Sequence, residues 1–387
     1  MKQILIVFFS IILFTGCFHV WLPSYSVTTV LLFLIYLFYR NCDSIYKLPL
    51  RIIAIGFLLS WISCKIYRGQ SFIDSFLAVP EYYAILLYFL FKGCRITFKN
   101  AEKALALLVL VYDIMFISQH YLYNVGINFM HIPEWSLGET LRMRAYASGL
   151  YSIGIFMGLT KWDNTRKGLY LIMMVMGVAC LFLTGYRQLF ISLIITIFIY
   201  NIYYKKVELG SFFKTVFIFS VLAYFFLQVS AFNENIDGMI ERNKADSFSN
   251  EIRLYQLYFY YNHYFNDYLE MFLGSGVPYE YSQFGQYKEN VLDSNHVLWV
   301  DWGFLGQSWV IGVTTVIGYL FLSIKAIKQS TSAENSYVAL WYIFLLLSVT
   351  NYEYFRQGNF YIHALALYIA ETASLEYSDE RKNVNIV

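Results

Sequence analysis

Residues 168–200 read GLYLIMMVMGVACLFLTGYRQLFISLIITIFIY, which is two apolar blocks separated only by Gly185, Tyr186 and Arg187. Each block approaches the roughly 20 apolar residues that an α-helix needs to cross a bilayer core of roughly 30 Å. An arginine in so short a break lies close to hydrocarbon, where a charge is costly unless it is paired or hydrated. The stretch therefore predicts membrane-spanning helices and makes Arg187 a functional candidate, with snorkelling to the interface as the alternative.

The rest of the chain repeats this pattern. It has 387 residues, of which 58% are hydrophobic and 14% charged, whereas soluble domains are usually about 45–50% apolar and about 25% charged. We expect an all-α polytopic membrane protein, a single integral domain over residues 1–387, with about 12 transmembrane helices of roughly 20 residues. The first block lacks a small-residue cleavage pattern, so we expect a span and not a signal peptide. The expected spans are about 4–21, 24–39, 49–64, 72–91, 104–120, 146–160, 168–184, 188–203, 214–230, 303–324, 336–350 and 359–374.

Lysine and arginine are distributed unevenly between the two sides that these spans define. If the N-terminus is inside, most of the 28 fall in inner loops, as the positive-inside rule predicts. The cations left outside are mostly arginines, whose planar guanidinium makes bidentate contacts with phosphate. They predict an anion bound at the outer face, such as a lipid phosphate, whereas the net charge of +2 gives no indication of nucleic acid. The outer set is Lys65, Arg68, Arg142, Arg144, Arg187, Arg242, Lys244, Arg253, Lys288 and Arg356.

One long outer segment, residues 231–302, interrupts the expected spans. Apolar residues recur in it at helical spacing after Asn250, which can cap a helix, and before Gly274 and Gly276, which can end one. We expect this periplasmic loop to be partly helical, with an amphipathic helix over the membrane face and Arg253 in its first turn. The recurring apolar residues are Leu254, Leu257, Tyr258, Tyr261, Phe265, Tyr268, Leu269 and Phe272.

The end of this segment carries the candidates for proton transfer. Asp293 and His296 lie three residues apart just before the tenth span, so on a helix they would share a face. Either side chain could accept a proton from an attacking hydroxyl group, and Asp301 follows nearby. The sequence has no P-loop, GxGxxG, DxD-like diphosphate motif or metal-ligand spacing, so we expect neither a metal nor a cofactor.

The other outer arginines leave alternatives open. Arg253 could be a plain surface charge. Arg142 and Arg144 precede the sixth span, where one could bind substrate while the other is solvated. Arg356 could simply pair with Glu353, three residues away. The arginines with no predicted role beyond ordinary surface charge are Arg68 and Arg242.

Three short motifs occur in the order typical of one group of membrane enzymes. Residues 184–187, Thr-Gly-Tyr-Arg, resemble a Thr-x-Ser-Arg motif at the outer end of a span, with Tyr186 in place of the usual serine. Residues 250–276 resemble an arginine-led loop helix that ends in a Gly-x-Gly turn, and residues 292–306 resemble a closing motif before a Gly-hydrophobic-hydrophobic-Gly span. Together they resemble the O-antigen polymerase and ligase superfamily, multi-spanning bacterial enzymes that move glycans from undecaprenyl diphosphate.

The resemblance implies a metal-independent, inverting glycosyl transfer by a GT-C-like glycosyltransferase. Arg187 and Arg253 would bind and neutralise the diphosphate leaving group of one lipid-linked chain. His296 or Asp293 would orient or deprotonate the acceptor sugar hydroxyl of a second lipid-linked unit, and the choice between them stays open. The further candidates for diphosphate or glycan contact are Arg142, Arg144 and Arg356.

The expected function is therefore that of a surface polysaccharide polymerase in the bacterial inner membrane, with its active site facing the periplasm. Its implied partners are undecaprenyl-diphosphate-linked oligosaccharides, membrane lipid and a chain-length regulator protein. The alternative is an O-antigen ligase, which transfers glycan to lipid A-core. Ligases carry His-Asn where this chain has Asp293-Ser294, so the difference favours a polymerase. An alternative of another class, a lipid-linked oligosaccharide flippase or transporter, would not need an ordered outer segment.

Overall fold

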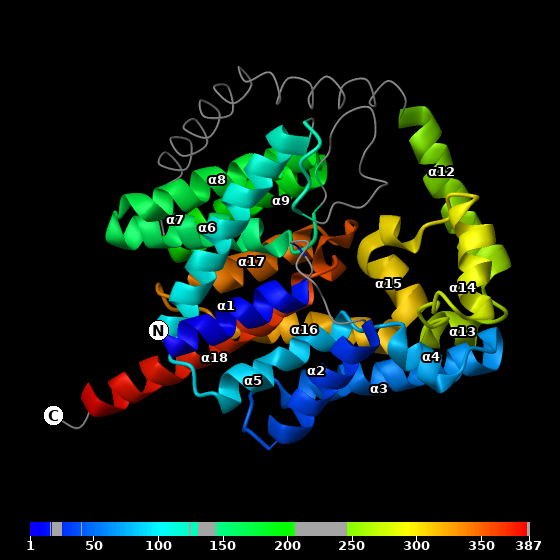
Figure 1. The fold of residues 1–387 in the computed structure, drawn as a ribbon, viewed down its shortest axis with the longest axis horizontal. Helices are drawn as coiled ribbons and strands as arrows, with labels where there is room; N and C mark the ends of the chain where they lie inside the picture. The colour runs from blue at the N-terminus through cyan, green and yellow to red at the C-terminus, as the bar shows by residue number, and fades with distance from the viewer. Residues whose placement is uncertain are drawn as a thin grey trace.

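The protein is all-helical, as its apolar blocks predict. The computed structural model describes residues 1–15, 17, 25–39, 41–123, 125–130, 143, 145–205 and 246–384, and these ranges contain no β-strand. Helices α6–α9 gather on one side and α2–α5 on the other, with α1 and α16–α18 between them (Figure 1). The N-terminus and the end of α18 lie at one end of the long axis, and α12–α14 lie at the opposite end.

Most helices in the first part of the chain coincide with apolar blocks. They are α1 (Lys2–Thr15), α2 (Tyr25–Tyr39), α3 (Lys47–Ser63) with its π-helical extension η1 (Cys64–Arg68), α4 (Phe72–Leu77), η2 (Tyr82–Leu86), α5 (Leu87–Gly93), α6 (Phe98–Tyr123), α7 (Gly149–Thr165), α8 (Gly168–Thr184), α9 (Arg187–Ile199) and η4 (Tyr200–Tyr204).

The second part begins with the outer segment and ends with three long helices. Its elements are α12 (Asp246–Phe259), η5 (Tyr260–Tyr264), α13 (Tyr268–Leu273), α14 (Gln283–Tyr287), η6 (Lys288–Asp293), η7 (Trp299–Trp302), α15 (Gly303–Ile311), α16 (Val313–Gln329), α17 (Ser336–Leu347), η8 (Tyr352–Phe355) and α18 (Asn359–Val384).

Two helical stretches of the described chain are long and apolar enough to cross a membrane, Lys47–Arg68 and Arg187–Tyr204. The stretch expected at 168–184 is α8 with the same bounds. The span expected at 214–230 lies outside the described residues. The shorter apolar helices are Lys2–Ile12, Thr28–Tyr39, Tyr82–Gly93, Gly168–Thr184 and Ser336–Leu347.

Two of the expected continuous helices are broken. The stretch at 72–91 is interrupted around Pro80, which has no backbone N–H to continue a helix. The stretch at 303–324 is interrupted at Gly312, where φ is +84° and an added Cβ would lie 2.2 Å from the carbonyl oxygen of Leu273. The expectation of one helix in each stretch was therefore wrong, and the second break exists because another segment approaches the backbone there.

That approaching segment is the Gly-Ser-Gly turn that follows α13. The N–H of Ser275 donates to the carbonyl of Trp309 (2.8 Å), and the N–H of Gly276 donates to that of Val310 (2.9 Å). The predicted stop at Gly274 is confirmed, since Gly274 ends α13 with a φ of +90°. The turn thus joins the outer segment to the break between α15 and α16.

The outer segment also has its own hydrophobic core. The ring of Tyr260 stacks on Trp309 of α15, with their centroids 4.3 Å apart. This small core extends across to Cys64 at the end of α3, so the segment is docked on two helices. Its buried members are Cys64, Tyr260, Tyr264, Phe284, Leu292, Val297 and Trp309.

The predicted amphipathic helix is present in two pieces. It begins at Asp246, so Asn250 lies inside it and does not cap it. It ends at Tyr264 and restarts at Tyr268, because Phe265 is extended and Asp267 caps α13 by accepting the N–H of Glu270 (2.8 Å). Most of its recurring apolar residues are exposed, namely Leu254, Tyr258, Tyr261, Tyr268, Leu269 and Phe272.

Arg68 is a structural residue, contrary to the expectation of an ordinary surface charge. Its Nε lies 2.6 Å from an oxygen of Glu270, whose side chain is fully buried. Its guanidinium also lies over the ring of Tyr264, 4.3 Å from the centroid, and donates to the carbonyl of that residue. The ion pair therefore fixes α13 to the end of the α3–η1 helix.

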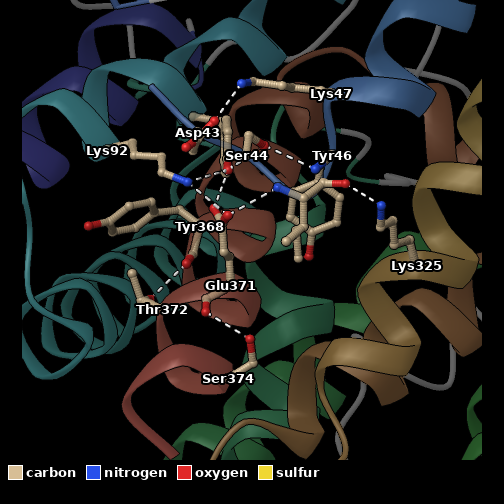
Figure 2. Close-up of polar contacts among 12 residues, drawn as sticks. Asp43, Ser44, Tyr46, Lys47, Lys92, Lys325, Tyr368, Glu371, Thr372 and Ser374 are labelled. Carbon is tan, nitrogen blue, oxygen red and sulfur yellow. Dashed lines mark hydrogen bonds and ion pairs between the residues drawn. The ribbon is translucent and has the colours of Figure 1, made fainter. Parts of the chain in front are cut away.

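A second polar cluster surrounds the buried Glu371 of α18 (Figure 2). Glu371 accepts hydrogen bonds from Lys92 of α5 (2.8 Å), from the N–H of Ile45 (3.2 Å) and from the hydroxyl of Tyr88. Lys325 of α16 donates to the carbonyl of Ile45. This cluster joins α18, α5, α16 and the turn before α3, and its lysines are ones that the sequence assigns to the inner side.

Candidate functional site

The break between α8 and α9 is a tight corner that begins the site. Gly185 follows α8 in the left-handed region, with a φ of +67°, which glycine adopts without strain. Tyr186 is extended and occupies the cap position of α9, and Arg187 is the first residue of that helix. The side chain of Arg187 is exposed. The sequence thus places Arg187 at a helix N-terminus, where the backbone dipole favours anions.

A second arginine packs against this corner. The guanidinium of Arg356 lies over the ring of Tyr186, with 4.8 Å from its carbon to the ring centroid. The side chain of Gln188 donates to the hydroxyl of Thr350 (2.5 Å). The segment around η8 is therefore fixed beside Arg187, which brings two of the predicted arginines into one region.

Arg356 is buried and its charge is balanced by Glu353. Its Nε lies 3.3 Å from Glu353, and the two side chains are 9% and 0% exposed. The other oxygen of Glu353 accepts a hydrogen bond from Ser148 (2.6 Å), and its carbonyl accepts one from Asn359 (2.7 Å). The predicted pairing of Arg356 with Glu353 is confirmed. The Nη1 atom of Arg356 is buried and has no hydrogen-bond partner in the described part of the chain.

Arg142 and Arg144 lie outside the described residues. The chain that follows them can be placed, because the N–H of Ala147 donates to the carbonyl of Gln357 (2.9 Å). Residues just after Arg144 therefore meet the segment that carries Arg356.

Asp293 and His296 do not share a helical face, contrary to the expectation. The π-helix η6 ends at Asp293, and His296 has a left-handed backbone with a φ of +56°. Its N–H donates to the carbonyl of Asp293 (3.1 Å), and its side chain is exposed. One oxygen of Asp293 is paired with Lys288 (2.7 Å). The two side chains thus have separate surroundings.

Gln256 links the helix of Arg253 to the loop of His296. The Nε2 atom of Gln256 donates to the carbonyl of His296 (2.6 Å) and to Asp301 (3.2 Å). Its Oε1 atom accepts from the indole N–H of Trp302 (3.1 Å). Arg253 lies on α12 one turn before Gln256 and is exposed. This buried amide therefore holds two of the predicted regions together.

Backbone contacts connect the His296 region with the Arg356 region. The N–H of Phe304 donates to the carbonyl of Val349 (3.0 Å). An added Cβ at Gly303 would lie 2.2 Å from the same carbonyl oxygen, and Gly303 has a φ of +50°. The Gly303 position therefore permits the start of α15 to lie directly against the segment that leads into η8.

Sequence reasoning missed the residues that hold this arrangement together, Ser148, Gln256 and Asn359. The available signal for Gln256 was a single amide in a run of tyrosines and leucines, and Ser148 and Asn359 gave none. Comparison with known proteins finds no family model and no curated protein that matches this chain.

Proposed function

We propose that the protein is a polytopic membrane glycosyltransferase that polymerises a surface polysaccharide. It joins undecaprenyl-diphosphate-linked repeat units at the outer face of the bacterial inner membrane. The observation that carries the proposal is the corner at Tyr186 and Arg187. It places a guanidinium at the start of Arg187–Tyr204, a helical stretch long enough to cross a bilayer, with buried Arg356 beside it. Such cationic sites at membrane helix ends suit a lipid-linked diphosphate.

The outward face of the other membrane-length helical stretch, which begins with α3, supports a membrane setting. Along α3, the side chains of Ile55, Leu58 and Ile62 are 54%, 53% and 43% exposed. A helix that presents a continuous apolar stripe outward needs an apolar environment to cover it. The N-terminus and the described end of α18 lie at the opposite end of the molecule from α12–α14 (Figure 1), as expected for inside termini and an outside loop.

The proposed reaction is a displacement at the anomeric carbon of the donor sugar. The acceptor hydroxyl forms the new glycosidic C–O bond while the bond to the diphosphate breaks, which inverts the configuration. Arg187 and Arg253 bind the diphosphate and stabilise the negative charge that develops on it. Arg142, Arg144 and Arg356 are further candidates for contact with diphosphate or glycan.

The hydroxyl proton goes to His296 or Asp293. Lys288 already occupies one oxygen of Asp293, whereas the ring of His296 is exposed at the surface. A base must come within hydrogen-bonding distance of the hydroxyl that it deprotonates. We therefore favour His296 as the base and assign Asp293 a supporting role.

The test is transfer by the purified protein in lipid nanodiscs with a lipid-linked repeat unit as the substrate. We expect wild-type protein to give long chains and Arg187→Ala and Arg253→Ala each to give none, with unchanged amounts of folded protein. The matched control is Arg166→Ala. Arg166 is another exposed arginine, which ends α7 on the predicted inner side, and its loss should leave polymer formation intact. Full-length polymer from Arg187→Ala would contradict the proposal.

The product of the same assay separates the rival functions. Extension on the lipid carrier identifies a polymerase. Transfer to added lipid A-core without extension identifies a ligase, and translocation without any new glycosidic bond identifies a transporter. In cells, loss of a polymerase leaves a single repeat unit on the core, whereas loss of a ligase leaves bare core.

A further inference from the structure

We infer that Tyr186 is a positioning residue for Arg187, held in place by the Glu353–Arg356 ion pair. The inference rests on the proposed diphosphate-binding role of Arg187 and adds the groups that orient it. The guanidinium of Arg356 lies over the aromatic face of Tyr186, with 4.8 Å from its carbon to the ring centroid, and only an aromatic side chain offers such a face.

Arg356 is buried and is held through several contacts. Its side chain is 9% exposed, and its Nε lies 3.3 Å from a carboxylate oxygen of Glu353. Glu353 is fixed in turn by the hydroxyl of Ser148 at one carboxylate oxygen. The segment is further fixed by Asn359, whose side chain accepts the N–H of Gly149 (2.7 Å) and donates to the carbonyl of Glu353. These contacts therefore hold the guanidinium of Arg356 in a fixed position next to the start of α7.

The guanidinium of Arg356 in turn determines the orientation of the corner between α8 and α9. Tyr186 lies between Gly185, whose left-handed backbone would otherwise allow the chain to pivot, and Arg187. A cation over an aromatic face is attracted by the ring quadrupole, most strongly where water is excluded. A ring held in this way restrains the backbone at the start of α9, from which the side chain of Arg187 extends. Charged side chains bind best when their supporting residues are preorganised.

The structure also contains the alternative support that the test must separate. The side chain of Gln188 bonds to Thr350 next to the same corner. If this hydrogen bond alone orients Arg187, removal of the Tyr186 ring will change nothing. If the ring is required, a hydroxyl-free aromatic residue will suffice, and an aliphatic residue of similar bulk will not.

The experiment measures binding of inorganic diphosphate to the full-length protein in nanodiscs by isothermal titration calorimetry. We expect Tyr186→Phe to bind like wild type and Tyr186→Leu to bind about tenfold more weakly, as the loss of a cation–π contact on a half-buried ring predicts. In an Arg187→Ala background, Tyr186→Leu should cause no further loss, because Tyr186 acts through Arg187. Thermal unfolding of each variant shows whether the fold is intact. Arg356→Ala is not a suitable variant, because it leaves Glu353 buried without its partner.

The outcomes distinguish the two proposals. Wild-type protein that does not bind diphosphate overturns the proposed function, and with it the role of Tyr186. Wild-type protein that binds, with Tyr186→Leu binding equally well, overturns only the positioning role. A loss from Tyr186→Leu that is the same with and without Arg187 also overturns it, because the effect would not pass through Arg187. The polymerase assay adds a second reading, in which Tyr186→Leu lowers polymer yield and Tyr186→Phe restores it.

Discussion

Arg68 and Glu270 form an ion pair of 2.6 Å between the end of the α3–η1 helix and the outer segment. Its acidic partner is fully buried, and the remaining oxygen of Glu270 accepts the backbone N–H of Asn266 (2.8 Å). This pair joins a membrane-length apolar helix to the segment that carries Arg253 and His296. The docking of the whole outer segment therefore depends on a charge that is nearly inaccessible to solvent.

We expect Arg68→Ala to destabilise the protein by about 3–5 kcal/mol, because it leaves a buried carboxylate without its counter-ion. The control is Lys47→Ala, which breaks an exposed pair with Asp43 (2.7 Å) and should lower the melting temperature far less, because exposed ion pairs contribute little to stability. Thermal unfolding in detergent measures both, and limited proteolysis should show cleavage of 246–302 first in Arg68→Ala. Equal melting temperatures for the two variants would show that the pair is not structural.

Gly312→Ala should undock the same segment by a steric route. The backbone there has a φ of +84°, and the new Cβ would meet the carbonyl oxygen of Leu273 at 2.2 Å. Gly168→Ala is the matched control, since an added Cβ at the start of α8 meets no atom within 4 Å. We expect a lower melting temperature for Gly312→Ala alone. Wild-type stability in that variant would mean that the break between α15 and α16 does not need glycine.

Acid should loosen α13. The N–H of Glu270, and after it the hydroxyl of Tyr67, hold the pKa of Asp267 below its ordinary value. A carboxylate whose pKa is lowered in the folded state contributes stability above its unfolded pKa of about 4. That contribution disappears as the pH falls through the lower, folded pKa. Protection of the Glu270 and Met271 amides from hydrogen exchange, relative to their intrinsic exchange rates, should therefore fall below about pH 4 in wild type, and should already be low at pH 7 in Asp267→Ala.

His296→Asn removes the imidazole, the proposed base, but keeps a residue that can adopt the backbone conformation of His296. Asparagine tolerates the left-handed conformation that His296 adopts, so the fold should be retained. Loss of a general base typically lowers the rate by about 10²–10⁴-fold. We expect polymer formation to fall by such a factor while diphosphate binding persists. A smaller loss in His296→Asn than in Asp293→Asn would transfer the role of base to Asp293.

Local patterns in the sequence predicted the features that depend only on local contacts. The bounds of α8 follow from one apolar block, and the end of α13 follows from Gly274. The ion pair of Arg356 and Glu353 follows from their spacing of three residues. In each case the partners are neighbours along the chain, so a pattern of a few residues is enough.

The remaining features depend on contacts between segments far apart in the chain. The break at Gly312 exists because Leu273 approaches it, and the burial of Arg68 depends on Glu270. Gln256 bonds to the carbonyl of His296, a backbone group that no side-chain pattern reveals. The contact between Tyr186 and Arg356 could be recognised only after the fold had placed η8 beside the corner. A single sequence carries no signal for such pairings.

The cluster around Glu371 has a consequence for biogenesis. Glu371 lies in α18, yet it is the acceptor for Lys92 and for the N–H of Ile45, which emerge from the ribosome long before it. Chains are synthesised from the N-terminus, and early segments begin to fold before later ones exist. Until α18 arrives, the lysine of α5 and the turn before α3 have no carboxylate to bind. The polar contacts of α5 and of the turn before α3 are therefore completed only after α18 has been synthesised.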